Sequence, residues 1–479
     1  MNVISNTLSS FIKKFLGFSI GPVVSAFLGL IIVPITTYFV SPEEFGKSSM
    51  YTLGYTLFSL IIYLGMDQAF VREYNAVKDK KKLFWSSFTI PFIFSLLFSI
   101  AILIFYKPIS MALFDSYEWY IMLLLSISMP FAVMDNFNML ILRMQEKAVL
   151  FSMMSVINKV VNLFVLLGYF LLVEKSFKAI INATFISLVI MVMAEIIINR
   201  EYWLSKINFD KVLIRRMFKF ALPLIPATII SWIFGSMDRM ALKEWSTYYE
   251  IGLFAAALKI SNVLGIFQQV FATFWVPTAY RWYEEGEPRE KFIKVSDYLT
   301  IVMTFLFICM LIFKKILMMV LASSYDNAAS SLTYLLFMPV LYTMSESTAI
   351  GITFKRKTSF NLIISILVAV INFILNFILV PKLGSLGAAI SSAVAYITFF
   401  WLRTIFSSIV WGKFDYKVYI ANTSIMIAAS IVDVVFNNSF LNAVFIIIFL
   451  LLNIKHVKEV YSLASGFLST KLGKGKEEL

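Results

Sequence analysis

Two adjacent charged residues occur at the end of an otherwise apolar segment. The stretch SWIFGSMDRMALKEW, residues 231–245, places Asp238 and Arg239 after a run of mainly apolar side chains. A charge at bilayer depth costs roughly 2.5 to 3.5 kcal/mol on insertion scales, so it needs a partner, a water-filled cavity or an exit to water. Arg239 could therefore bind an anion in a cavity, or it could pair with Asp238 and reach the outer headgroups.

Two lysines also lie among apolar residues. In SVINKVVN, the residues Ser155, Asn158, Lys159 and Asn162 stand at positions i, i+3, i+4 and i+7 and share one helical face. Such a polar stripe often holds helices together in membranes, but a lysine at mid-depth favours a wet cavity. A second lysine shares its face with an amide in the same way: Lys259 with Asn262.

Other polar residues in apolar segments are amides and acids. Asn372 and Asn376 lie one helical turn apart and are further candidates for cavity residues. Asp135 and Glu346 lie deep in apolar segments, where they could pair with a lysine or bind a coupling ion such as Na⁺ or H⁺. Glu195 lies near the end of its segment, where we expect it to reach interfacial water.

The composition indicates an integral membrane protein. Hydrophobic residues make up 60% of the chain and charged residues only 14%, whereas about a quarter of the residues in soluble domains are charged. The single cysteine, Cys309, and the single histidine, His456, leave no set of residues for a zinc site, a disulfide or a Ser-His-Asp triad. We expect no cofactor and no metal. The basic residues are spread over many short connections, which does not suit nucleic-acid binding.

Apolar windows of about 20 residues, the length needed to cross a bilayer, predict an all-helical protein with fourteen transmembrane spans. Their centres lie near Leu28, Leu57, Leu97, Met129, Val160, Val189, Ile229, Ile266, Thr304, Tyr342, Val370, Tyr396, Ala428 and Ile446. Lys and Arg concentrate in the connections after even-numbered spans, such as VREYNAVKDKKK and FKRKTSF. Since cytoplasmic loops retain positive charge, both termini are predicted to be cytoplasmic.

The chain contains an internal repeat. SPEEFG, which ends at Gly46, corresponds to STYYEIG, which ends at Gly252, and three further landmarks follow in the same order. Six helices per unit give parallel repeats, with a cavity expected between two lobes. The predicted organisation is an N-lobe over residues 1–199, a cytoplasmic linker over 200–218, a C-lobe over 219–410, two extra spans over 411–454 and a basic cytoplasmic tail over 455–479.

Two prolines mark the start of the seventh span. Pro223 and Pro226 lie within one turn of each other in FALPLIPATII. A proline removes a backbone hydrogen bond and kinks a helix. We therefore predict a hinge at this point, although prolines are also frequent in membrane helices that do not move.

Several stretches together resemble a known family. FKFALPLIPATIISWIFGSMDRMALKEW, IGLFAAALKISNVL, FWVPTAYRWYEE, NFILNFILVPKLGSLGAAISSAVAY and the amino-terminal LGLIIVPITTYFVSPEEFG are similar to polysaccharide (O-antigen type) flippases of the multidrug/oligosaccharidyl-lipid/polysaccharide exporter superfamily. The resemblance extends over residues 10–410. It implies two six-helix lobes, alternating access and a location in the bacterial inner membrane.

The resemblance also implies a substrate and a site. The substrate would be an undecaprenyl-diphosphate-linked oligosaccharide for O-antigen, lipopolysaccharide or another surface polysaccharide, and polymerase and other assembly proteins would be partners alongside membrane lipids. In the family, basic cavity residues are thought to meet the diphosphate, which points to Arg239, Lys259 and Lys159. The first span, residues 15–39, has no Lys or Arg, unlike lipid II flippases of this superfamily. It also has no Asp or Glu, unlike many drug-extruding relatives.

Two other classes of function remain open. One is a cation-coupled antiporter for drugs or small molecules from the same superfamily. The other is a polytopic polysaccharide polymerase or glycosyltransferase, which would normally carry a long external loop with catalytic residues. The connections predicted to be external, such as VSPEEFGK, are short. The sequence therefore favours a transporter over an enzyme.

Overall fold

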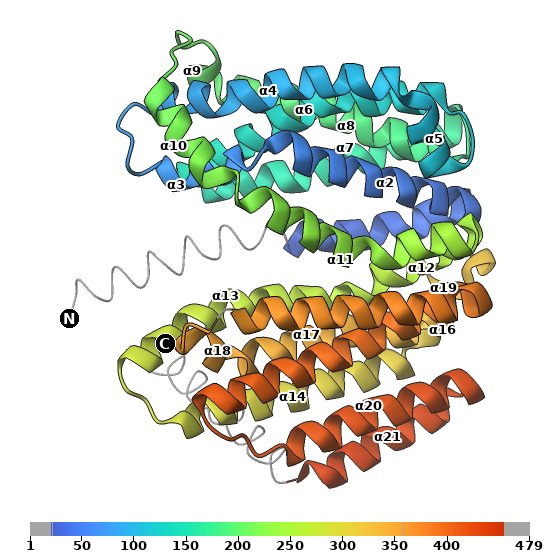
Figure 1. Ribbon diagram of the computed structural model, residues 1–479. Helices are drawn as coiled ribbons and strands as arrows, with labels where there is room; N and C mark the ends of the chain where they lie inside the picture. Colours follow the sequence, from blue (N-terminus) through green and yellow to red (C-terminus); the bar gives the residue numbers. More distant parts are fainter. Residues whose placement is uncertain (1–20, 22, 358, 455–479) are drawn as a thin grey trace, which may run out of the picture. The chain divides into compact units, whose positions relative to one another are not determined.

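The computed structural model describes residues 21, 23–357 and 359–454, and every regular element within these ranges is a helix. An apolar helix over Val23–Phe39 comes first. The later helices are numbered α2 to α21, and most of these labels appear in Figure 1. Helices suit a bilayer because their backbone hydrogen bonds are all made within one segment. The predicted all-helical membrane fold is confirmed, whereas the predicted tail over residues 455–479 lies outside the described residues.

The chain divides into two compact units, residues 1–255 and 256–479. In the first unit, α6 packs against α2, α4, α7 and α8, and aromatic rings such as Phe84, Phe88 and Phe137 fill the space between helices. The helices that follow Val23–Phe39 in this unit are α2 (Pro42–Tyr63), α3 (Met66–Glu73), α4 (Lys80–Ile104), α5 (Tyr106–Phe114), α6 (Trp119–Met144), α7 (Ala148–Leu172), α8 (Phe177–Ile198), α9 (Arg200–Trp203), α10 (Lys211–Ala221), α11 (Leu224–Trp245) and the start of α12 (Tyr248–Ser261).

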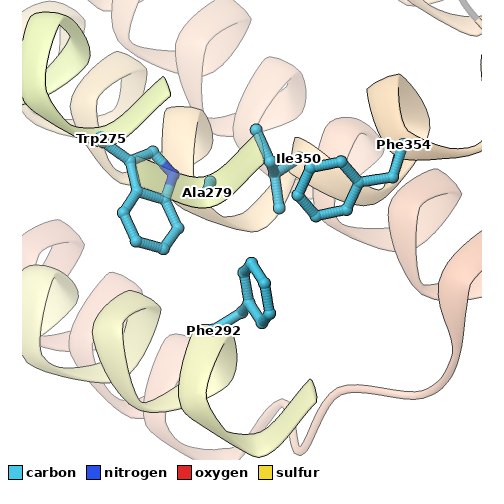
Figure 2. Close-up of a cluster of buried hydrophobic side chains, with 5 residues drawn as sticks. All are labelled: Trp275, Ala279, Phe292, Ile350 and Phe354. Atoms are coloured by element: carbon cyan, nitrogen blue, oxygen red, sulfur yellow. The ribbon is translucent and has the colours of Figure 1, made fainter. Parts of the chain in front are cut away.

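In the second unit, α17 packs against α13, α14 and α19, and α20 packs against α14 and α21. Figure 2 shows one part of its core, where Trp275 and Ala279 of α13 meet Phe292, Ile350 and Phe354. The elements after α12 are α13 (Val263–Glu284), α14 (Arg289–Ile312), α15 (Lys314–Met319), the 3₁₀ helix η1 (Ser323–Tyr325), α16 (Ala328–Leu335), α17 (Phe337–Thr348), α18 (Ile350–Phe354), α19 (Ser359–Trp411), α20 (Lys417–Phe436) and α21 (Ser439–Leu452).

Nine helices of the described residues are long and apolar enough to cross a membrane, or up to eleven if each of two bent pairs is one span. The bent pairs are α2 with α3, at 52°, and α12 with α13, at 45°. Each of the fourteen predicted span centres lies inside a helix. The exact number of fourteen spans stays a prediction, because the apolar helices Val23–Phe39 and Phe440–Leu452 are shorter than a typical span.

The helix α19 is two helices joined by a reversal. It has 53 residues, but Gly384 has non-helical dihedral angles of φ 53° and ψ −129°. A side-chain carbon added at Gly387 would lie 2.5 Å from the carbonyl oxygen of Leu379. Residues eight positions apart in a straight helix are separated by about 12 Å, so the chain must turn back between them. The predicted eleventh and twelfth spans are therefore the two arms of α19.

The two glycines of the first repeat landmark lie against each other. A side-chain carbon added at Gly46 of α2 would overlap the carbonyl oxygen of Tyr248 and lie 3.0 Å from the amide nitrogen of Gly252. One added at Gly252 of α12 would overlap the carbonyl oxygen of Pro42. Only glycine allows two helix backbones to come this close. The corresponding motifs of the predicted repeat thus form one tight helix crossing.

The segment between α8 and α11 packs on the first unit through polar contacts. The Asp210 carboxylate caps α10 by accepting from the backbone N–H groups of Val212 and Leu213, and it pairs with Lys82 at 2.9 Å. The N–H of Leu213, followed by Lys82, lowers the pKa of Asp210. Arg216 pairs with Glu73 of α3 at 2.5 Å. These contacts fix the start of α10 before the chain enters α11.

The predicted hinge coincides with an interruption of the helix. α10 ends at Ala221, and α11 begins at Leu224 with Pro223 as its N-cap residue. Pro226 is the third residue of α11. The first four N–H groups of a helix have no partner within it, so a proline there removes no intrahelical hydrogen bond. Leu222 and Pro223, between the two helices, keep right-handed helical dihedral angles, and Lys211–Trp245 counts as one candidate span. The interruption is therefore short, and the hinge itself stays a prediction.

Candidate functional site

Arg239 and Asp238 lie in the second half of α11. Both side chains are half-buried, and the negative charge of Asp238 acts on the Arg239 guanidinium. The helix is positioned against α2, where Trp232 Nε1 donates to Thr56 Oγ1 at 3.1 Å. Arg239 is thus placed on a packed helix, next to an acidic residue. This arrangement is compatible with both interpretations of the sequence, anion binding and a local ion pair.

Lys159 lies midway along the 25-residue apolar helix α7, and its side chain is exposed. Its neighbours on the same face are half-buried: Asn158 and Asn162. Asn162 Nδ2 donates to Ser187 Oγ of α8 at 3.5 Å, so this amide contributes to the contact between α7 and α8. The stripe therefore combines helix contact at Asn162 with an exposed cation at Lys159.

Lys259 and Asn262 lie at the bend between α12 and α13. Both side chains are exposed, and Asn262 precedes α13 as its N-cap residue. The bend of 45° interrupts the helical backbone hydrogen bonds at the same place. A cation beside a broken membrane helix suits ion or headgroup binding, because such breaks occur where the backbone is buried in protein or faces water. Lys259 belongs to the second unit, and Lys159 and Arg239 belong to the first.

The two amides of α19 are buried. Asn372 is 3% exposed and Asn376 is fully buried, and Asn376 Nδ2 donates to Asn372 Oδ1 at 3.0 Å. This geometry favours the packing role that polar residues often have between membrane helices. Their place in a cavity stays a prediction.

The two acidic candidates have different surroundings. Glu346 of α17 pairs with Arg403 of α19 at 3.0 Å, and Arg403 also donates to Ser345 Oγ at 2.7 Å. Asp135 of α6 interacts electrostatically with Glu195 of α8. Glu195 is only 1% exposed, so the expectation that it reaches interfacial water is wrong. The bundle of α6 and α8 covers it.

Several polar contacts were not predicted from the sequence. Arg403 was not expected to pair with Glu346, and Lys314 of α15 forms a buried ion pair with Asp433 of α20 at 2.5 Å. Asn442 of α21 donates to Asp433 Oδ1 at 2.7 Å. This network joins the last two helices to the rest of the second unit. The signal in the sequence was the presence of a charge in an apolar segment, but nothing local identified its partner.

A metal centre finds no support in the residues that the structure describes. No group of three or more His, Cys, Asp or Glu side chains in them is arranged to hold a metal ion.

Comparison with protein families identifies the chain. The family model described as "Polysaccharide biosynthesis protein" matches residues 11–282, which is more than half of the chain. The protein belongs to this family. The predicted resemblance to polysaccharide flippases is thereby confirmed at the level of the family. No curated protein matches the sequence significantly.

Solved structures with the same fold are flippases and transporters. The structure "Lipid II flippase MurJ, inward closed conformation" is 19% identical, with a TM-score of 0.69, and covers 93% of this chain and 98% of that chain. The inward-facing conformation of a multidrug resistance MATE family transporter of the MOP superfamily is 16% identical, with a TM-score of 0.60, and covers 83% and 98%. Its outward-facing counterpart is 13% identical, with a TM-score of 0.55, and covers 83% and 95%.

These likenesses show that the chain has the multipass helical fold of the structures named above. The fold agrees with the prediction of a transporter rather than an enzyme. Polysaccharide biosynthesis as the biological context follows from the family.

Proposed function

We propose that the protein flips an undecaprenyl-diphosphate-linked oligosaccharide repeat unit from the cytoplasmic to the outer leaflet of the bacterial inner membrane by alternating access. The observation that carries this proposal is the combination of a polysaccharide biosynthesis family match with a flippase and transporter fold. The protein would act before polymerisation of O-antigen or another surface polysaccharide. Polymerase and other assembly proteins would be its partners, and both of its termini would be cytoplasmic.

Cations in apolar helices support an anionic substrate. Lys159 is exposed halfway along α7, Lys259 is exposed at the bend after α12, and Arg239 is half-buried in α11. We assign these three residues to binding of the diphosphate. A diphosphate loses its hydration when it enters hydrocarbon, and cationic side chains offset that loss while the prenyl tail stays in lipid. The side chains of Asn158, Asn162, Asn262 and Asp238 would contribute polar contacts nearby.

The membrane potential favours export of such a substrate. With the inside of the cell negative, outward movement of an anion gains about 2.3 kcal/mol per charge per 100 mV. If cationic side chains of the protein move outward together with the anion, they cancel part of this gain. Export of a diphosphate can thus proceed with modest additional driving force from a coupled ion.

Mutation of the cations tests the proposal. In cells that lack the chromosomal gene, Arg239→Ala or Lys259→Ala should reduce surface polysaccharide while the protein still inserts into the membrane. The matched control is Lys175→Ala, because Lys175 is an exposed lysine in the connection between α7 and α8. Normal display in both single variants and in the double variant would contradict the assignment of these residues.

Loss of the gene tests the function itself. Deletion should leave a lipid-linked repeat unit on the cytoplasmic leaflet. Labelling of the glycan in intact and permeabilised cells with a lectin distinguishes the two leaflets. If the unit reaches the outer leaflet and stays unpolymerised, the protein is a polymerase instead.

A second candidate is a cation-coupled antiporter of drugs or small molecules, and the similarity in fold to multidrug transporters favours it. The two candidates differ in the charge of the substrate. Reconstituted protein that moves a cationic dye and leaves a fluorescent undecaprenyl diphosphate sugar in place would favour the antiporter.

A further inference from the structure

The short helix α10 has two different faces. Its buried residues recur every four positions and are Leu213, Met217 and Ala221. This face packs on α3 and α4 of the first unit. Three basic residues, Lys211, Arg215 and Lys219, follow the same spacing two positions earlier, and their side chains are exposed. Two positions correspond to about 200° around a helix, so these three residues, here called the basic stripe, lie opposite the buried face.

The basic stripe has no acidic partner among the described residues. The two nearby carboxylates pair with other cations: Asp210 with Lys82, and Glu73 with Arg216. Like charges four positions apart on a helix repel each other, and α10 has no acidic residue in its first turn. A bound anion would relieve this repulsion. The stripe is therefore suited to negatively charged groups, and the two ion pairs hold it in place.

Large apolar side chains are exposed beside the stripe. Val212, next to Lys211, is 79% exposed, and Leu204 in the connection before α10 is 83% exposed. Ile207 and Phe209 of the same connection are exposed as well. Contiguous exposed apolar groups indicate a site of interaction. The boundary between headgroups and acyl chains accommodates apolar and basic side chains together.

The length of the following span places α10 at the edge of the membrane. Lys211–Trp245 is one candidate span of 35 residues, about 52 Å long at a rise of 1.5 Å per residue. The hydrocarbon core is about 30 Å thick, and about 20 residues cross it. The excess includes the charged end, because no basic residue follows Lys219 until Arg239. α10 is thus expected at the depth of the phospholipid headgroups.

A second basic segment lies at the same end of the first unit. Figure 1 shows α3, α9, α10 and the start of α4 at this end, and α5 at the other. The connection between α3 and α4 exposes Lys78 and Lys81, and both helices pack on α10. These two lysines and the stripe bring five exposed cations to this end. The distribution of Lys and Arg predicts that it is cytoplasmic.

We propose that α10 and the connection before it bind the headgroups of anionic phospholipids. The basic stripe contacts the phosphates, and the exposed apolar side chains insert at the boundary with the acyl chains. Since α10 continues through Pro223 into α11, a bound headgroup also fixes the start of the helix that contains Arg239. Such a site serves the surrounding lipid and does not depend on what the protein transports.

The apolar side chains distinguish lipid from other anions. Inorganic phosphate or a nucleic acid would neutralise the stripe and leave Leu204 and Val212 in water. A phospholipid offers both a negative headgroup and an apolar environment within a few ångströms. The combination on α10 therefore favours lipid.

Native mass spectrometry of the full chain tests the site. The protein in a neutral detergent is incubated with equal amounts of dioleoyl phosphatidylglycerol and dioleoyl phosphatidylcholine, which share their acyl chains and differ in net charge. The wild type should retain phosphatidylglycerol in excess. The triple variant Lys211→Gln, Arg215→Gln and Lys219→Gln should lose this preference, by up to roughly fivefold for each cation removed.

Two control variants match the triple variant. The first removes the same charge from exposed lysines of three separate elements, by Lys107→Gln, Lys175→Gln and Lys382→Gln. It should keep the preference, because these lysines do not form a stripe. The second control is Lys211→Arg, which keeps the charge and should also keep the preference. All the substitutions are at exposed positions, so the variants should fold.

Two further measurements distinguish lipid from a free anion. Val212→Ser removes an apolar contact and keeps every charge, so it should lower the retention of phosphatidylglycerol. Inorganic phosphate added at constant ionic strength should leave the lipid bound, because it provides charge without acyl chains.

Three results would overturn the proposal. The first is equal retention of the two lipids by the wild type. The second is a triple variant that keeps the preference, or a charge-matched control that loses it to the same extent. The third is displacement of the lipid by inorganic phosphate, which would assign the stripe to free anions. None of these results bears on flipping, so the proposed function is tested separately.

Discussion

The contact between α2 and α12 gives the sharpest test of the packing. Gly252 lies so close to α2 that a side-chain carbon would be 2.6 Å from the carbonyl carbon of Pro42 and 3.0 Å from its Cα atom. Ordinary van der Waals contact begins at 3.4 Å. Gly252→Ala must therefore push the two backbones apart by at least about 0.8 Å, and overpacking of this kind costs about 1 to 3 kcal/mol. The expected result is a lower free energy of unfolding.

The direction of the stability change distinguishes a steric conflict from an effect of helix propensity. Alanine is a better helix former than glycine by about 1 kcal/mol, so a substitution without steric conflict should stabilise the helix. Gly168 of α7 is the matched control, because nothing lies within 4 Å of a side-chain carbon added there. We expect Gly168→Ala to raise the unfolding temperature slightly and Gly252→Ala to lower it.

Thermal unfolding in detergent, followed by tryptophan fluorescence, measures both variants. Gly46→Ala should resemble Gly252→Ala, since Gly46 forms the other half of the same crossing. The two changes should not be additive, because the first already separates the helices. A Gly252→Ala protein as stable as Gly168→Ala, or full additivity with Gly46→Ala, would refute the close crossing.

The remaining predictions concern polar contacts. Asp210→Ala should loosen the start of α10, whereas Asp210→Asn should keep the cap, and hydrogen exchange of the α10 amides distinguishes them. Because the pKa of Asp210 is lowered, its ionised form stabilises α10 above the ordinary aspartate range, and protection should fall below about pH 4 in the wild type but not in Asp210→Asn. Lys314→Met should reduce stability by about 3 to 5 kcal/mol in thermal unfolding because it leaves Asp433 buried without its cation, and adding Asp433→Leu should recover most of the loss. Arg403→Met should have a smaller effect, since that pair is less buried; a loss as large as that of Lys314→Met would contradict the reasoning.

The sequence by itself determined the class of protein and the positions of its helices. Apolar length is a local property, and each predicted span centre lies within a helix of the structure. Local signals also explain the helix starts, because Pro223 begins α11 and Asp210 caps α10. The repeat paired the segments that end at Gly46 and Gly252, but it did not predict that these two glycines meet. The family assignment followed from ordered motifs along the chain.

Only the tertiary structure decided which polar groups meet. Asp135 and Glu195 are on different helices, and Lys314 and Asp433 are 119 residues apart. A helical pattern shows which residues share a face, but it does not show which neighbour that face contacts. Glu195 illustrates the consequence, since its position near a helix end suggested water and its packing against α6 removes it from water. Partners depend on packing between distant segments, and that packing is not encoded in any single stretch of the chain.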